Sequence, residues 1–379
     1  MTKRTRAQAA APVALAVPYL QSTPRIATIL GSFLVLALPL AVLQMATVSP
    51  DAKFGVMVTY AVLLGGTHFL ITLAVYAHSD NLRYFASSGQ RIAIYFVAPI
   101  ALLGIFFVIG YFNLNADRPD ASVGFLLYTF FFAVCVRAAD YFHVVRQSFG
   151  MLQLFKSQVP ATFPRWTRRA DNTFFVSMAG LQLLTAVRGI RTGEAVFAPD
   201  LLSLLVLAIV LVSLVGVLAG FASAARTSKQ PRELWLPFAY FLFQGASASL
   251  AAMRTELYTA SLAMHYVEYH VIIFPRLFRF ELHPDSRADR IAGWLRRHKL
   301  VFYAGLALLA CFVSRELWPA VMLRFGSPGA PWLVFNLLSG IFVVHYFIEA
   351  FIWKFRDPYY RASLGPMYFP PRPKTPASA

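Results

Sequence analysis

The chain is built mainly of apolar segments separated by short polar loops, and most of these segments are long enough to cross a membrane. A helix needs about 20 mostly apolar residues to span the hydrocarbon core of a bilayer. The pattern therefore predicts an all-α, polytopic membrane bundle of about ten transmembrane helices. The expected spans are residues 27–47, 55–77, 91–112, 122–144, 172–187, 199–223, 234–250, 255–275, 300–322 and 331–353.

The composition also indicates a membrane protein. The 379 residues are 58% hydrophobic and only 13% charged, whereas a soluble domain carries about 25% charged residues. The two cysteines, Cys135 and Cys311, both lie in apolar segments. They imply no disulfide framework, and the chain has no Cys-x-x-Cys metal or haem-attachment motif. The loops leave no room for an independent soluble domain.

Basic residues gather in alternate loops. Runs such as FPRWTRR, ARTSKQPR and DRIAGWLRRHK fall on one side of a ten-span bundle, and such loops are normally cytoplasmic. We therefore predict a multi-pass protein of the inner (plasma) membrane with both termini in the cytoplasm. A basic tail at 1–26 precedes the bundle at 27–355, and a Pro-rich tail follows at 356–379. The net charge of +17 then reflects topology and attraction to the lipid bilayer rather than nucleic-acid binding. The oligomeric state stays open.

Six of the eight histidines lie within or at the edge of apolar segments. Ionisable side chains inside a membrane are costly, so they are candidates for functional sites. The predicted topology puts five of the six at the cytosolic side, where facing helices of a bundle can build a metal site. The expected metal ligands are His68, His78, His143, His265, His270 and His345.

Three of these histidines have an acidic residue within one helical turn on the same face. Such a carboxylate can be a co-ligand, or it can accept a hydrogen bond from the second ring nitrogen of a ligand. For Asp140, an ion pair with Arg137 three residues earlier is the structural alternative. The acid–histidine pairs are Asp140 with His143, Glu268 with His265, and Glu349 with His345.

Helical periodicity limits which histidines can share one ion. His265 and His270 are five residues apart, which is about 140° around an ideal helix. Both reach one ion only if their helix contains a π-bulge. His68 and His78 are ten residues apart, about 15 Å along a helix axis, so a continuous helix cannot bring both to one ion. Whether either joins the site stays open. The expected core of the site is His143, His265, His270 and His345.

The ligand types indicate the chemistry. Imidazole with carboxylate suits iron, zinc, copper or nickel, and the lack of thiolate ligands argues against copper(I) and iron–sulfur centres. We predict one or two non-haem iron ions in an oxygenase or desaturase-like oxidoreductase. It would act on a lipophilic small-molecule substrate at the inner leaflet and draw electrons from a cytosolic donor. Haem and zinc are the alternative cofactors. The alternative functions are a haem-binding electron-transfer protein, a transporter with a His/acid proton relay, and an acyltransferase with one catalytic histidine.

Two short segments carry a resemblance to known membrane enzymes. They hold His345 with Glu349, and the His265–His270 pair on one helix. With these the chain resembles the bacterial β-carotene oxygenase (Brp/Blh-like) membrane proteins, which place single histidines on separate spans around one iron. It is more distantly similar to membrane desaturases and hydroxylases, but it lacks their His-x-x-x-His and His-x-x-His-His boxes. The resemblance implies a non-haem iron site.

Overall fold

The regular elements of the protein are helical, as the sequence predicts. The structure, a computed structural model, describes residues 22–46, 49, 56, 60–114, 131–193, 196–278, 286–312 and 330–369. In these segments an antiparallel bridge between Val196 and Arg254 is the only β pairing. The predicted tails at 1–21 and 370–379, and the predicted span residues 122–130 and 313–322, lie outside the described residues.

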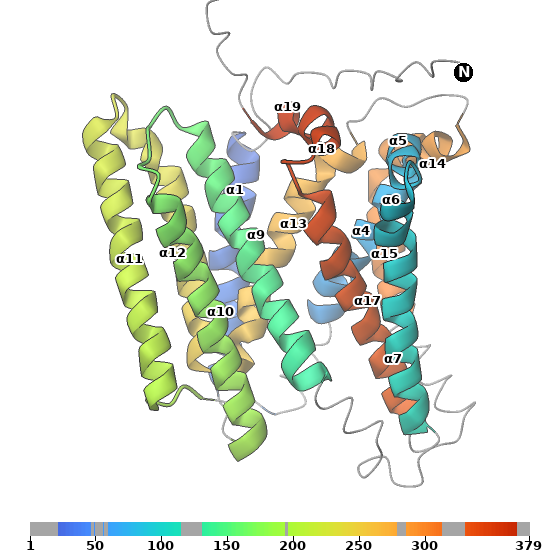
Figure 1. The fold of residues 1–379 in the computed structure, drawn as a ribbon, viewed down its shortest axis with the longest axis horizontal. Coiled ribbons are helices and arrows are strands. Elements are labelled where there is room, and N and C mark those ends of the chain that lie inside the picture. The colour runs from blue at the N-terminus through green and yellow to red at the C-terminus, as the bar shows by residue number, and fades with distance from the viewer. Residues whose placement is uncertain are drawn as a thin grey trace, which may run out of the picture.

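The long helix α13 (Tyr258–Phe278) runs through the middle of the bundle (Figure 1). It contacts elements from both sides of the molecule, including α4, α9 and α12. On one side lie α9 (Arg137–Gln158), α10 (Thr167–Thr192), α11 (Leu201–Thr227) and α12 (Trp235–Met253). On the other lie α4 (Thr67–Leu73), α7 (Ala98–Leu114), α15 (Lys299–Phe312) and α17 (Ala330–Ile352). The first described helix, α1 (Thr23–Ser32), continues through η2 (Phe33–Ala37) into α2 (Leu38–Met45), and all three pack on α13.

Short helices gather at one end of the bundle. Figure 1 shows α5 (Ser79–Phe85), α14 (Arg287–Arg297), α18 (Pro358–Ser363) and α19 (Gly365–Tyr368) at this end. The predicted C-terminal tail thus begins with two packed helices, since Tyr360 and Tyr368 are buried in the core. The remaining short elements are η4 (Ala74–Ala77), α6 (Gly89–Ile92), η8 (Pro231–Leu234) and η9 (Thr255–Leu257).

Five helices in the described part of the chain are long and apolar enough to cross a membrane: Thr23–Met45, Gly89–Phe112, Thr167–Ile190, Leu201–Thr227 and Pro231–Met253. Apolar side chains on them are widely exposed, Val212 of α11 by 73%, as expected for helices that face lipid. The structure supports these five spans rather than all ten predicted. Leu63–Ala77, Lys299–Phe312 and Asn336–Ile352 are apolar but shorter. The eighth predicted span forms α13, which holds His265, Glu268, His270 and Arg276 and is not among the five candidate spans.

π-Helical turns interrupt several of the apolar helices. Two of them, η3 (Ala61–Gly66) and η7 (Phe131–Val136), come directly before α4 and α9. These two helices carry His68 and His143. A π-turn inserts an extra residue into the helical repeat, and it therefore rotates the face that later residues present. The remaining two described turns are η2 and η5 (Ala93–Val97).

Candidate metal centre

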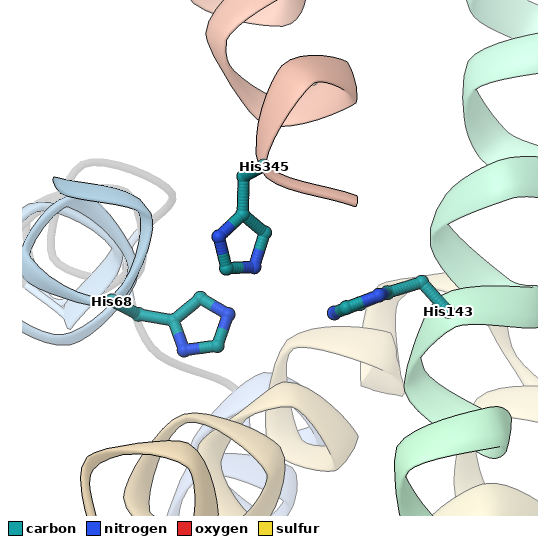
Figure 2. A group of neighbouring side chains, drawn as sticks. All are labelled: His68, His143 and His345. Atoms are coloured by element: carbon teal, nitrogen blue, oxygen red, sulfur yellow. The ribbon is translucent and has the colours of Figure 1, made fainter. Parts of the chain in front are cut away.

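Three imidazoles from three different helices converge in the interior of the bundle. They belong to His68 on α4, His143 on α9 and His345 on α17, and Figure 2 shows them turned toward a common centre. One nitrogen from each ring lies within 4.8 Å of the corresponding nitrogens of the other two. His68 and His345 are at most 1% exposed, and the side chain of His143 is 10% exposed. Two of the three, His143 and His345, belong to the core that the sequence predicts.

His68 is the least satisfied of the three. It is completely buried, and within the described part of the chain neither of its ring nitrogens has a hydrogen-bond partner. Its ring lies 4.4 Å from that of His345, centroid to centroid. A buried polar group without a partner is costly, so such groups are normally bonded or bound to metal. The surroundings of His68 therefore fit a metal ligand better than a packing residue.

The orientation of His345 is fixed from behind by Thr72. The Thr72 hydroxyl lies 2.8 Å from Nδ1 of His345 and 2.6 Å from the hydroxyl of Tyr269. Nε2 of His345 has no hydrogen-bond partner, which leaves it available to an ion. Hydrogen bonds of this kind select the tautomer and the ring orientation of metal-binding histidines.

Glu349 places a carboxylate beside two of the imidazoles. Its Oε2 lies 3.3 Å from Nε2 of His143, and its Oε1 lies 3.7 Å from Nε2 of His345. Glu349 is nearly fully buried, at 5% exposure. The structure therefore brings the predicted acidic partner of His345 within reach of a shared ion.

The two histidines of α13 have different surroundings. The ring of His265 lies 4.8 Å from that of His68 and 5.0 Å from that of His143, and its Nδ1 has no partner. His270 lies further away, with its ring 6.3 Å from that of His68 and its Nε2 3.3 Å from the Thr67 hydroxyl. Because α13 is a regular helix, the five-residue spacing separates the two rings. His265 thus borders the centre.

His78 lies away from the three converging imidazoles. It stands where η4 meets α5, and its backbone is extended. It lines a small cavity together with Asn81 and Arg276. The helix of His68 ends before His78, so the spacing rule for a continuous helix does not apply to this pair, and His78 is not in the group of three.

The other two predicted carboxylates accept hydrogen bonds from side chains that neighbour the candidate histidines. Asp140 accepts a 2.6 Å hydrogen bond from the hydroxyl of Tyr346, whose ring stacks on His143 with a centroid distance of 4.5 Å. Glu268 accepts hydrogen bonds from the amides of Gln244 and Gln147. Gln147 also donates to the carbonyl of His265 at 3.1 Å. Both carboxylates thus hold neighbours of the candidate ligands.

Sequence reasoning missed Thr72, Gln147 and Gln244 as parts of this site. One signal was present for Thr72, which lies four residues after His68 and so shares its helix face. The two glutamines lie on different helices from the residues they contact, so their sequence neighbourhood gives no such signal. Comparison of the chain with protein-family models, with curated proteins and with solved structures finds no match in any of the three.

Proposed function

We propose that this protein is an integral membrane metalloenzyme that binds its metal through His68, His143, His345 and Glu349. The convergence of three buried imidazoles from three helices carries this proposal. His265 is the additional candidate ligand, while Asp140 and Glu268 keep a supporting role. His270 lies further from the three imidazoles, and His78 lines a separate small cavity.

The residues fit a metal ion by geometry and by donor type. With metal–nitrogen bonds of about 2.1 Å, ligands of one ion lie about 3 to 4 Å apart. One ring nitrogen from each of the three histidines now lies within 4.8 Å of the other two. Small rotations of the side chains bring these nitrogens to the shorter separation. The donors are imidazole and carboxylate, the set that non-haem iron enzymes use. An iron ion held there would supply oxygen activation.

More specifically, we propose that the enzyme is an oxygenase or resembles a desaturase, and that it acts on a lipophilic substrate. The bundle that holds the site includes five candidate spans, so a substrate that dissolves in the bilayer would have access to its surface. The remaining elements of the proposal are cytoplasmic termini, the plasma membrane and a cytosolic electron donor. The basic loop helices at one end of the bundle (Figure 1) support the orientation.

The geometry favours this proposal over the two main alternatives. Axial haem ligands approach the iron from opposite faces of the porphyrin, so a third imidazole within 4.8 Å of both would occupy the place of the macrocycle. A proton relay finds support in the bonds that connect His345, Thr72 and Tyr269. It leaves His68, which has no hydrogen-bond partner, without a role.

Elemental analysis of detergent-purified protein, with a visible spectrum, tests the proposal. We expect roughly one or two iron ions per chain and no Soret band. His68→Ala, His143→Ala and His345→Ala should each lose most of the metal, whereas His298→Ala, at an exposed residue after α14, should retain it. Size-exclusion profiles identify variants that fail to fold. Protein free of metal after growth and purification with added iron, or a Soret band, would refute the proposal.

A further inference from the structure

A second cavity of the bundle is lined almost entirely by apolar side chains. It has a volume of about 380 Å³ and lies between α10, α11 and α12. All three helices are candidate spans. Phe174, Met178 and Leu181 of α10 line it on one side, and Phe241 and Gly245 of α12 line it on another. The cavity arises because α11 packs closely along α10 but not along α12. The η8 segment joins α11 to α12.

The cavity opens sideways, toward the surface that faces lipid. Leu242, Ala246, Ser249 and Met253 of α12 line it and are all exposed. Their spacing of four, three and four residues places them in one stripe along the helix. On α11 the rim includes Leu211, which is 52% exposed. The opening is therefore continuous with the apolar surface of two membrane helices.

Neither water nor empty space suits this cavity. A bound water needs two to four polar partners, and the one hydroxyl in the lining, that of Ser249, already donates to the carbonyl of Gly245 at 2.8 Å. An empty cavity would forfeit the dispersion contacts of its lining atoms. In a bilayer that these three helices span, the long apolar chains of the lipids would lie directly beside the opening. Their chemistry matches that of the lining.

We infer that this cavity binds an acyl chain of a membrane phospholipid. The chain enters between α11 and α12 and packs against the phenyl rings of Phe174 and Phe241. The cavity lies toward the end of α12 that carries Met253, away from η8. The lipid therefore belongs to the leaflet at the Met253 end. The inference uses no residue of the metal centre, so it stands independently of the proposed enzyme.

Photochemical labelling in vesicles tests this inference. The protein is reconstituted into phosphatidylcholine–phosphatidylglycerol vesicles that contain phosphatidylcholine with a diazirine in its acyl chain, and adducts are mapped by peptide mass spectrometry. We expect adducts concentrated on the cavity-facing residues of α11 and α12. Ala246→Phe, which fills the cavity, should lower them several-fold.

Val212→Phe is the matched control, because Val212 is exposed to lipid on α11 but does not line the cavity. It should leave the adducts at the cavity unchanged. If Ala246→Phe does not elute as a monodisperse species, Ser249→Leu provides the same test. Adducts spread evenly over all exposed faces of α11, or adducts that persist at the cavity in a well-folded Ala246→Phe, would overturn the inference.

Discussion

At the scale of single residues, the two ring nitrogens of His345 have different surroundings. Nδ1 is bonded to Thr72, while Nε2 faces His143, His68 and Glu349 without a hydrogen bond. Thr72→Val keeps the shape of the side chain and removes the hydroxyl. We expect a loss of metal affinity of about 10- to 100-fold, the usual effect of removing such a support. Competition of the loaded protein with a chelator measures it.

Thr259→Val is the matched control for Thr72→Val. Thr259 is partly exposed, and its hydroxyl donates an exposed hydrogen bond to the carbonyl of Glu256 one turn earlier. We expect the Thr259→Val protein to bind metal with the affinity of the wild type. If Thr72→Val also binds metal as tightly as the wild type, the role assigned to the Thr72–His345 bond is wrong.

At the scale of elements, the close packing of α7 on α17 depends on a glycine. A Cβ atom at Gly110 of α7 would lie 2.9 Å from the Cα of Leu333 on α17. Because backbone cannot move aside cheaply, Gly110→Ala should push α17 away and destabilise the protein by about 1 to 3 kcal/mol. Since α17 carries His345 and Glu349, metal binding should weaken as well. Unfolding in mixed micelles measures the first effect, and chelator competition the second.

Gly104 on the same helix provides the control. A Cβ atom there would meet nothing within 4 Å, so Gly104→Ala gains helix propensity without a clash. We expect it to be neutral or to stabilise the protein by up to about 1 kcal/mol. Equal stabilities of the two variants would show that α7 and α17 do not need the close contact at Gly110.

Element-scale packing also explains how far the sequence could predict the site. Apolar runs and helical spacing were enough to predict helices and the proximity of His345 to Glu349. They placed both His265 and His270 in the expected core only on condition of a π-bulge, which the regular helix α13 lacks. The place of His68 in the centre was left open, because it depends on how α4 packs against α9 and α17. The π-turn before α4 adds to the difficulty, since it alters the face of the helix that a regular repeat would predict.

At the scale of the whole molecule, the two ends of the bundle differ in the charged residues that they carry. Arginines of α5, α14 and α18 lie in the short helices at one end (Figure 1). The link between α12 and α13, with Arg254 and Glu256, lies at the other end of α12 from η8. Because basic loops stay in the cytoplasm, the end with α14 should be cytoplasmic.

Labelling of single cysteines in intact cells tests this orientation. In a background with Cys135→Ala and Cys311→Ala, the exposed residues Ala86, after α5, and Glu256, in η9, are replaced one at a time by cysteine. A membrane-impermeant maleimide should label Glu256→Cys in intact cells, and Ala86→Cys only after the membrane is permeabilised. The opposite pattern would invert the proposed topology. It would also move any cytosolic electron donor to the other face of the metal centre, because such a donor can approach only from the cytoplasmic side of the membrane.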